Sequence, residues 1–439
     1  MIPNPSIMKA VEQLGYRVTT GDVAAQAGID LNIAQQQLLA LASDAGGHLQ
    51  VAESGEIAFQ FPKDFRTILR NKFWRLKLQE WWEKVWRVLF YLIRISFGIL
   101  LIASILLIFV SITLIVIAVN SSRDGDDSGG SNDMGGGGFI FVPHFWFGPD
   151  WFWFFYWDDD YYYRRRQRSV NSQNNQYNFL EAVFSFLFGD GNPNANLEER
   201  RWKTIATLIR NNQGAIIAEQ VAPYLDEISP QQQEYEDYML PVLTRFNGYP
   251  KVSPEGQIVY HFPDLQTTAT QFRPQPIASY LKEQLWKFSQ ATSGQIMLAA
   301  GLGVVNIFGA IILGSLLQDQ ALVQALGGLV AFVDVIFPLL LAYGIGFLTV
   351  PLLRYLWMKW RNRRIEVRNQ NRQERVAMLH QAKDSVQQKL SFARQFAAET
   401  VVTQNNLAYT TESDLVEQEL EQADKIDAEW QQRLNQSNS

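Results

Sequence analysis

Hydrophobic and polar positions alternate in two short stretches of the chain, and each stretch predicts a β-hairpin. In Gly47–Pro62, the side chains of Ile57, Phe59 and Phe61 share one face of a strand that follows a Ser-Gly turn. The same pattern recurs 201 residues later in Gly248–Pro263, around a Glu-Gly turn. The identical pairs are Gly47/Gly248, Val51/Val252, Gly55/Gly256, Ile57/Ile258, Phe61/Phe262 and Pro62/Pro263. This repetition predicts a duplicated cassette of helices, hairpin, linker and membrane segment.

Three helical patterns precede the first hairpin. Apolar residues recur at helical spacing in Pro5–Leu14, Thr20–Gly28 and Leu31–Ala42. Thr20 and Asp30 are expected to cap the second and third helices, because their side-chain oxygens can accept the first free backbone N–H groups. Three helices followed by a hairpin resemble a winged helix. Residues 1–64 are therefore interpreted as a first, degenerate winged-helix domain.

A second set of helical patterns precedes the second hairpin. Leu197–Gln213, Ala215–Leu225 and Pro230–Phe246 are predicted as its three helices. A short apolar stretch, Tyr177–Phe188, and a turn-rich run come before them. Residues 179–268 are interpreted as a second, degenerate winged-helix domain.

Three apolar runs are long enough to cross a bilayer, and they cover residues 88–119, 295–317 and 321–353. The first run contains one charged side chain, Arg94, near its start, where it can reach the membrane interface. The second is rich in glycine and alanine, which permits close helix packing. The predicted fold class is α+β and mainly α. It consists of two degenerate winged-helix domains, a helical membrane domain and a C-terminal helical tail.

Basic and aromatic residues flank the apolar runs. Residues 65–87 form a basic amphipathic linker that is expected at the membrane interface, with a solvated helix as the alternative. Residues 120–178 combine a disordered Gly/Asp linker with an aromatic stretch, Phe139–Tyr163, which is interpreted as interfacial or re-entrant. Residues 269–294 form a second amphipathic linker. The tryptophans expected at the interface are Trp74, Trp81, Trp82, Trp86, Trp151, Trp153 and Trp157.

The C-terminal tail, residues 354–439, begins with basic residues and continues with helix-forming sequence. Val376, Leu379, Val386 and Leu390 follow an approximate heptad. This apolar face predicts either a partner helix or a homo-oligomer through the tail. A solvated surface helix is equally consistent with the pattern.

Charge limits the class of partner. The formal net charge is −6, and both domains carry more carboxylates than cations. Residues 1–62 contain two cations and six acids, and residues 197–265 contain six cations and ten acids. Neither domain can neutralise phosphates as a DNA-binding winged helix does, so nucleic acid is disfavoured as a partner. The expected partners are membrane lipids and proteins that the sequence does not identify.

Composition also limits the chemistry. The chain contains no cysteine, which excludes disulfides, thiolate metal ligands and a cysteine nucleophile. Its four histidines, His48, His144, His261 and His380, are scattered. A nucleophile, a base and an orienting group are not recognisable together, so neither an enzyme activity nor a cofactor or metal is predicted. The first residues lack a basic stretch followed by an apolar one, so a cleavable signal peptide is not expected.

Asp334 lies in the middle of the third apolar run, close to Pro338. A carboxylate at bilayer depth is costly and is by default a functional candidate. Asn306 in the second run and Arg94 in the first are its candidate partners. This arrangement supports an alternative function as a small transporter or channel subunit. A purely structural role for Asp334 in helix assembly is also consistent with the sequence.

The basic flanks of the apolar runs conflict with three simple crossings. Basic residues mark the cytoplasmic side, and they place both the N-terminus and the C-terminus there. Three crossings would put the termini on opposite sides. Either the aromatic stretch within residues 139–157 returns the chain, or one run does not span. The basic cluster Arg164–Arg168 favours a return, which places both winged-helix domains on the cytoplasmic face.

The run FSFLFGDGNPNANLEERRWKTIATLIRNNQGAIIAEQVAPYLD, with the acidic linker and aromatic stretch before it, resembles a cyanobacterial and plastid membrane-protein family. The resemblance covers most of the chain. Plant members are sometimes labelled as an iron–sulfur cluster biosynthesis family, which implies cluster chemistry. A chain without cysteine has no thiolate ligand set for a cluster. The family implies a thylakoid or other photosynthetic membrane, or the plasma membrane of a cyanobacterium.

The function predicted from these observations is that of an integral membrane scaffold or assembly factor that docks proteins through its acidic winged-helix domains. A transporter or channel subunit that uses Asp334 is one alternative. An accessory factor in iron–sulfur cluster biogenesis, acting through a cysteine-bearing partner, is a second. A membrane-tethered regulator is a third.

Overall fold

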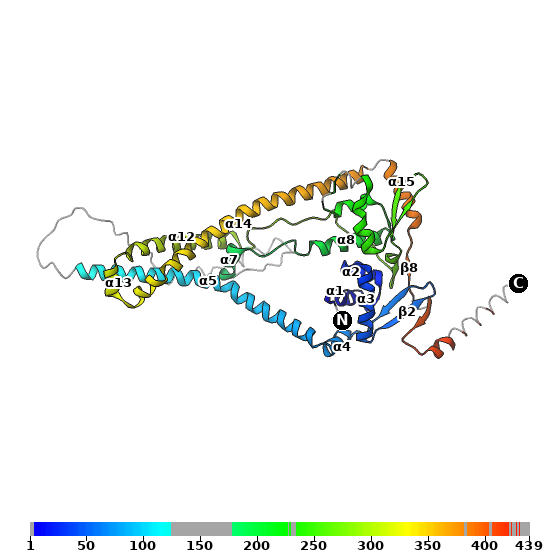
Figure 1. The fold of residues 1–439 in the computed structure, drawn as a ribbon, viewed down its shortest axis with the longest axis horizontal. Coiled ribbons are helices and arrows are strands. Elements are labelled where there is room, and N and C mark those ends of the chain that lie inside the picture. Colours follow the sequence, from blue (N-terminus) through cyan, green and yellow to red (C-terminus); the bar gives the residue numbers. More distant parts are fainter. Residues whose placement is uncertain are drawn as a thin grey trace, which may run out of the picture. The chain divides into compact units, whose positions relative to one another are not determined.

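The computed structural model describes residues 4–123, 178–226, 228–229, 234–381, 384–403 and 406–420, and the single positions 423, 427 and 430 (Figure 1). The chain divides into two compact units. The head unit comprises Met1–Lys84, Asn192–Leu285 and Asn362–Ser439. The span unit comprises Val85–Gly191 and Trp286–Arg361. The described residues are mainly helical with small sheets, so the predicted class, α+β and mainly α, is confirmed.

The first helix–hairpin module of the head unit runs from α1 to β3. Its elements are α1 (Pro5–Gln13), β1 (Arg17–Thr19), α2 (Thr20–Ala27), α3 (Leu31–Ala45), β2 (His48–Ala52) and β3 (Ile57–Gln60). Thr19 caps α2 instead of the predicted Thr20, because Thr19 is extended and its side chain accepts the Asp22 N–H. Asp30 caps α3 as predicted. This helix continues past Ala42, since Gly46 is the residue whose left-handed conformation ends it.

The second helix–hairpin module runs from α8 to β6. Its elements are α8 (Leu197–Asn211), β4 (Ala215–Ile216), α9 (Ala218–Val221), η3 (Ala222–Tyr224), η4 (Asp237–Met239), α11 (Leu240–Phe246), β5 (Tyr249–Val252) and β6 (Ile258–His261). The predicted helix at Ala215 is wrong at its start, because Ala215–Ile216 pairs with β6 as a strand. Among its described residues, the predicted helix Pro230–Phe246 is interrupted at Glu236, whose φ is 55°. Pro241 stands in the first turn of α11, a position that tolerates the missing proline N–H.

Both predicted hairpins are confirmed, and they share one register. His48 pairs with Gln60 in the first sheet, and Tyr249 pairs with His261 in the second. β1 and β4 each add to the inner strand, so the orders are β1-β3-β2 and β4-β6-β5. Gly55 and Gly256 have φ of 85° and 80°, which explains why both turns require glycine. The two modules therefore have matching sheets, strand for strand.

The tail adds a strand to the sheet of the first module and forms a separate two-stranded sheet with the chain that follows the second hairpin, and the sequence predicted neither pairing. Strand β9 (Leu407–Thr410) pairs antiparallel with the outer edge of β2. Strand β8 (Thr400–Val401) pairs parallel with β7 (Thr267–Thr268), which follows the 3-10 turn η5 (Pro263–Leu265). The apolar face predicted from the heptad pattern packs against another part of the same chain. In and before α15 (Asp384–Ala393), Leu379, Val386 and Leu390 pack on the sheet of the second module, against a core of Ala215, Ile217 and Val259.

The cores of the two modules meet along one interface. Ile7, Val11, Leu38 and Phe59 lie in the core of the first module. The core of the second also takes in Ala24, Ala25, Leu31 and Ala34 from α2 and α3 of the first. Apolar burial across α2 and α8 therefore joins the two modules into one body.

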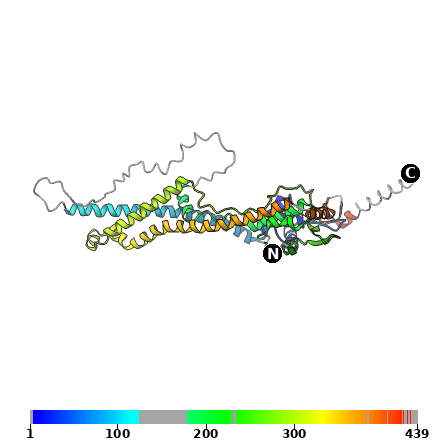
Figure 2. The ribbon, with the colours of Figure 1, turned by 90° about the horizontal axis from the view of Figure 1, so that it is seen from above.

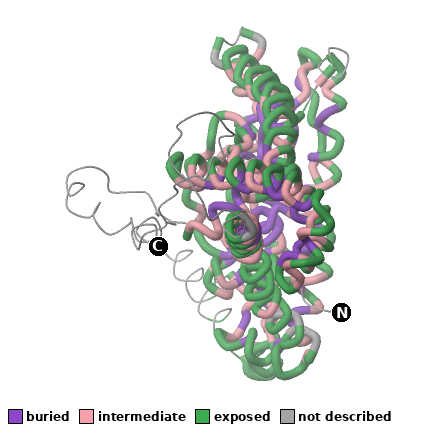
Figure 3. Tube along the Cα trace, turned by 90° about the vertical axis from the view of Figure 1, so that its left-hand side faces the viewer, coloured by how far each residue is buried: buried purple, intermediate pink, exposed green. Residues whose placement is uncertain are grey.

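The span unit is built on long apolar helices. Its elements are α5 (Trp74–Arg123), which begins in the head unit, α7 (Phe179–Phe188), α12 (Ser293–Leu316), α13 (Gln320–Leu326) and α14 (Gly328–His380), which ends there. Three of the described helices are long and apolar enough to cross a membrane: Trp81–Ser121, Ser293–Leu316 and Gly328–Leu379. Figure 1 and Figure 2 show α5, α12 and α14 running side by side, and their shared core includes Ile108, Ala310, Leu313 and Val333. Figure 3 marks such buried residues in purple.

Two predicted segments differ from the described structure or lie outside it. The third apolar run, 321–353, is not one helix, because the chain breaks at Gly327 (φ 55°) between α13 and α14. The linker 269–294 has no helix before α12 begins at Ser293. The aromatic stretch Phe139–Tyr163, with Trp151, Trp153 and Trp157, lies outside the described residues, as do residues 124–138 of the Gly/Asp linker.

Candidate functional site

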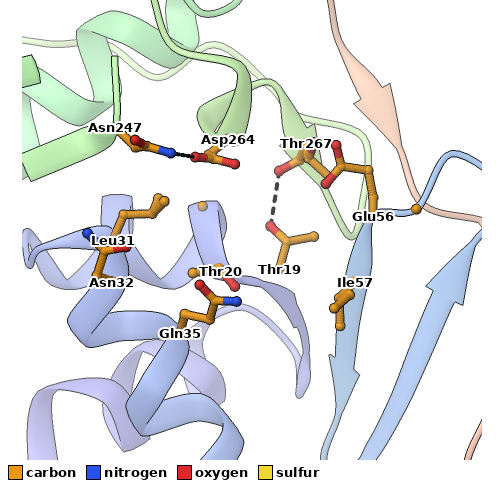
Figure 4. Close-up of a pocket in the computed structure, with 12 residues that line it drawn as sticks. Thr19, Thr20, Leu31, Asn32, Gln35, Glu56, Ile57, Asn247, Asp264 and Thr267 are labelled. Carbon is orange, nitrogen blue, oxygen red and sulfur yellow. Dashed lines mark hydrogen bonds between the residues drawn. The ribbon is translucent and has the colours of Figure 1, made fainter. Parts of the chain in front are cut away.

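A polar groove lies between the two modules of the head unit (Figure 4). Its volume is about 210 Å³. The first module contributes the start of α2, the exposed side of α3 and the turn of its hairpin. The second contributes the end of α11 and the chain that follows its hairpin. The lining residues are Thr19, Thr20, Gly21, Leu31, Asn32, Gln35, Gly55, Glu56, Ile57, Asn247, Asp264 and Thr267.

Close backbone contact fixes the width of the groove. A Cβ atom at Gly21 would overlap the carbonyl oxygen of Asp264, so only glycine lets α2 approach η5 this closely. The hydroxyl of Thr19 donates to the carbonyl oxygen of Thr267 at 3.0 Å (Figure 4). Asn247 ends α11 in the left-handed conformation, and its Nδ2 donates to Asp264 Oδ2 at 2.8 Å. These contacts therefore fix the positions of the residues at the rim of the groove.

A buried ion pair beside the groove joins the two modules. Arg210 Nη2 lies 2.6 Å from Asp22 Oδ1, with both side chains less than a tenth exposed. Asp22 Oδ2 also accepts the backbone N–H groups of Thr19 and Ala269, at 3.0 and 2.9 Å. The guanidinium of Arg210 stacks on the ring of Phe272 at 4.5 Å. These partners replace hydrogen bonds to water that the buried carboxylate of Asp22 loses on folding.

The tail fastens to the second module through two further ionic clusters. Glu283 accepts both guanidinium branches of Arg368, at 2.8 and 2.6 Å, and lies 2.9 Å from Arg372. Burial alone would raise the pKa of Glu283, but these two arginines outweigh it and lower that pKa. Lys389 reaches Glu219 at 2.8 Å and Glu236 at 2.7 Å. Burial opposes its charge, but the two carboxylates raise the pKa of Lys389.

The groove presents hydrogen-bond acceptors without a matching cation. The side-chain carboxylate of Glu56 has no hydrogen-bond or ion-pair partner among the described residues, and Glu56 is half-buried at the edge of the hairpin turn. Asn32 and Gln35 are exposed on the facing side of α3. Among the described lining residues, none is a lysine, arginine or histidine. The surplus of carboxylate and amide oxygens favours an ammonium or guanidinium group as the ligand.

The structure separates the three polar residues predicted in the membrane runs. Arg94 Nη2 lies 2.9 Å from Asp190 Oδ1, and Asp190 also accepts the Ser185 hydroxyl. Asn306 is buried, and its Nδ2 donates to Ser104 Oγ at 2.7 Å. Asp334 is half-buried on α14, and its side chain forms no hydrogen bond or ion pair with another described residue. Arg94 and Asn306 therefore bond to partners other than Asp334.

The four described tryptophans of the predicted interface are all more than half exposed: Trp74 (72%), Trp81 (56%), Trp82 (57%) and Trp86 (52%). They stand on α5, whose first turns also carry basic residues. A second aromatic group in the span unit was not predicted from the sequence: Arg361 stacks on Trp286 and Trp357 at 4.7 and 5.0 Å. The spacing of Trp357 and Arg361, one helical turn apart, is the signal that would have revealed it.

Comparison with known proteins places the chain in a family. Neither a protein-family model nor a solved structure matches it. The chain is 38% identical over 449 residues to "Uncharacterized protein At5g03900, chloroplastic" of Arabidopsis thaliana, across 98% of this chain and 82% of the plant protein. The chain belongs to the family of this plant protein. The match supports the plastid part of the predicted resemblance, and the plant protein's name mentions neither an iron–sulfur cluster nor a winged helix.

Proposed function

We propose that the protein is an integral membrane scaffold or assembly factor of a photosynthetic, thylakoid-type membrane, and that it docks protein partners through the two modules of its head unit. Three membrane-length helices and a chloroplastic relative support the location. The observation that carries the docking role is the acidic groove between the modules, whose walls are fixed by backbone contact and ion pairs. We interpret the modules as winged-helix domains with a protein-binding role.

The proposed partner segment bears lysine or arginine. The carboxylate of Glu56 is unpaired among the described residues, and the facing side-chain carbonyl oxygens of Asn32 and Gln35 can accept the remaining N–H groups of a guanidinium. The volume of about 210 Å³ suits one long basic side chain with its neighbouring backbone. The acidic excess that disfavours nucleic acid thus becomes the basis of recognition.

The head unit holds both modules and the tail together, which supports placing all three on the same side of the membrane. Both modules and the tail belong to a single unit, and Gln50 of β2 pairs with Thr410 of the tail. Segments that share a sheet cannot be separated by a bilayer. We therefore propose that both modules and the tail lie on the same, cytoplasmic or stromal, face of the membrane.

A photo-crosslinking residue at Gln35, in the full chain within its native membrane, tests the docking role. Position 35 lines the groove, whereas the exposed neighbour Gln36 does not and is the matched control. We expect a defined adduct from position 35 whose attached peptide contains lysine or arginine, and loss of that adduct with Glu56→Lys or in high salt. Equal adducts from positions 35 and 36, or indifference to Glu56→Lys, would contradict the proposal.

An ion pathway at Asp334 is the second candidate function. Pro338 stands inside α14 and has no N–H to donate to the carbonyl oxygen of Asp334, which places two oxygen acceptors at one level of the helix. Asp334→Asn in reconstituted vesicles would then abolish cation-driven flux while the protein still assembles. Unchanged flux in that variant would exclude this candidate.

A further inference from the structure

The two hairpins differ at their outer edges. The outer edge of β2 is occupied by the tail strand β9, whereas β5 has no described strand on its outer side. An outer strand exposes every second N–H and carbonyl group, and these groups bind an added strand. The two modules share one hairpin register, so their edges can be compared residue by residue.

Three residues of the first hairpin point their backbone groups toward the tail. The Leu49 N–H donates to the Thr411 hydroxyl at 2.9 Å, and the Leu49 carbonyl accepts the Thr411 N–H at 2.9 Å. Val51 is paired with Tyr409. The Glu53 N–H donates to the Asn406 carbonyl at 2.9 Å. The segment Asn406–Thr411 is thus held mainly by backbone groups at alternate positions.

The second hairpin carries proline at two of these three positions. Its turn repeats that of the first: Ser253 N–H donates to Gln257 as Ala52 N–H does to Glu56, each at 2.8 Å. By this register Pro250 stands in place of Leu49, and Pro254 in place of Glu53. Proline has no N–H, and its ring occupies the space that an added strand needs.

The two sheets also differ in the side chains on the face that receives the tail in the first module. Leu407 of the tail packs in a small core with Ala52, Ala58 and Val402. In the second hairpin these alanines correspond to Ser253 and Val259. Val259 is already covered by Ala393 of the tail. The second sheet therefore lacks both the backbone donors and the apolar seat that receive Leu407 in the first.

We propose that the outer edge of β2 is a strand-addition site for an extended peptide, filled by the chain's own segment Asn406–Thr411, and that Pro250 and Pro254 close the matching edge of the second module. The prolines are specificity-determining residues, since they direct the tail to one of two otherwise matching hairpins. A partner that binds the outer side of β5 is consequently recognised through side chains and not through a backbone ladder.

Cysteine pairs in the full chain test this assignment cleanly, because the protein has no cysteine of its own. A short bifunctional thiol reagent should join Val51→Cys to Tyr409→Cys and should not join Val252→Cys to Tyr409→Cys. Adding Leu49→Pro and Glu53→Pro, the residues of the second hairpin, should reduce the first crosslink about tenfold or more, since two backbone donors are lost. The control pair Leu49→Ala and Glu53→Ala keeps both N–H groups and should retain the crosslink.

Hydrogen exchange of the Ala58 amide, which lies opposite Gln50 of β2, reports whether the first hairpin survives the prolines. Loss of the crosslink with that amide still protected supports the proposal, and a retained crosslink overturns it. Equal loss in the alanine control also overturns it, because side chains would then hold the tail.

If the two prolines unfold the first hairpin, the reverse substitutions in the second hairpin test the proposal instead. Pro250→Leu with Pro254→Glu should let Val252→Cys capture a cysteine-bearing peptide of sequence Asn406–Thr411. Failure to capture it overturns the proposal.

Discussion

Asp22 shows how much one side chain can connect. It completes the cap of α2, accepts the N–H of Ala269 and pairs with Arg210 of the other module. The sequence identifies Asp22 only as one of six acids in its domain. Its partners lie far away in the chain, so helical spacing gives no hint of them. Residues of this kind decide whether the groove keeps its shape.

Removing the charge of Asp22 should loosen the interface between the modules. Asp22→Asn leaves the guanidinium of Arg210 buried without its counter-charge, which should lower the free energy of unfolding of the head unit by about 3 kcal/mol. Hydrogen exchange of the full chain in detergent measures this change. The exposed pair Lys203–Glu199 is the control, and Glu199→Gln should cost less than about 0.5 kcal/mol. Similar losses in both variants would refute this role for Asp22.

Glu283 should make the head unit sensitive to acid. Its pKa in the folded state is lowered, so its contribution to stability is complete above its unfolded pKa of about 4.3 and is lost as the pH falls through the folded pKa. Glu283→Gln should remove this contribution and flatten the loss of stability on acidification. The free energy of unfolding measured between neutral and acid pH would show the difference. An unchanged slope in the variant would contradict the assignment.

At the scale of elements, glycines set how closely the apolar helices pack. The sequence predicted that small residues on α12 allow close approach of other helices, and the structure shows which of these residues contact a neighbouring helix. A Cβ atom at Gly303 would lie 2.6 Å from the Phe347 ring of α14, and one at Gly309 would lie 2.9 Å from Ile108 of α5. Gly301 faces open space. Nothing in the composition of the run distinguishes the glycines that contact a neighbour from the one that does not.

Gly303→Ala should weaken the contact between α12 and α14, whereas Gly301→Ala should not. The added methyl at position 303 forces the ring of Phe347 to move, with an expected cost of about 1–3 kcal/mol. At position 301, alanine has space and a better helix propensity, so its effect should be neutral or slightly stabilising. Thermal unfolding of the two variants in the same detergent compares them. A larger loss at position 301 would overturn the ranking.

The parts of the fold that follow local periodicity were predicted, and the parts that depend on distant pairing were not. The hairpins, the helices of the first module and the membrane-length runs each carry a repeating pattern of their own. The four-residue β9 and the two-residue β8 are too short to show a period, and their partners are more than a hundred residues away in the chain. The groove shares this limit, since Glu56 and Asp264 acquire a common site only when the modules pack.

At the scale of the whole molecule, the head unit is assembled from three separate parts of the chain, with membrane-length helices between them. If the whole head lies on one face of the membrane, as proposed above, the chain must return to that face before the second module. Such a return cannot be read from hydropathy, because the argument for it comes from the pairing of the head.

Labelling from one side of sealed vesicles tests the sidedness. Single cysteines at Gln36, Glu255 and Gln318 are all exposed, and they report the first module, the second module and the connection between α12 and α13. Gln36→Cys and Glu255→Cys should react from the same face, and Gln318→Cys from the opposite one. Ser253 is unsuitable for such labelling, since it is only 5% exposed. Opposite reactivity of positions 36 and 255 would refute a common side.

The pairing of β2 with β9 has a consequence for the order of synthesis. The first module is translated before the three membrane-length helices, yet the strand that adds to the edge of its sheet is translated after them. Until Leu407 has been made, the edge of β2 remains open to strands of other chains. Closure of this edge therefore marks a polypeptide whose membrane-length helices have all been produced, and a chain truncated before β9 would retain an open edge that can bind strands of other chains.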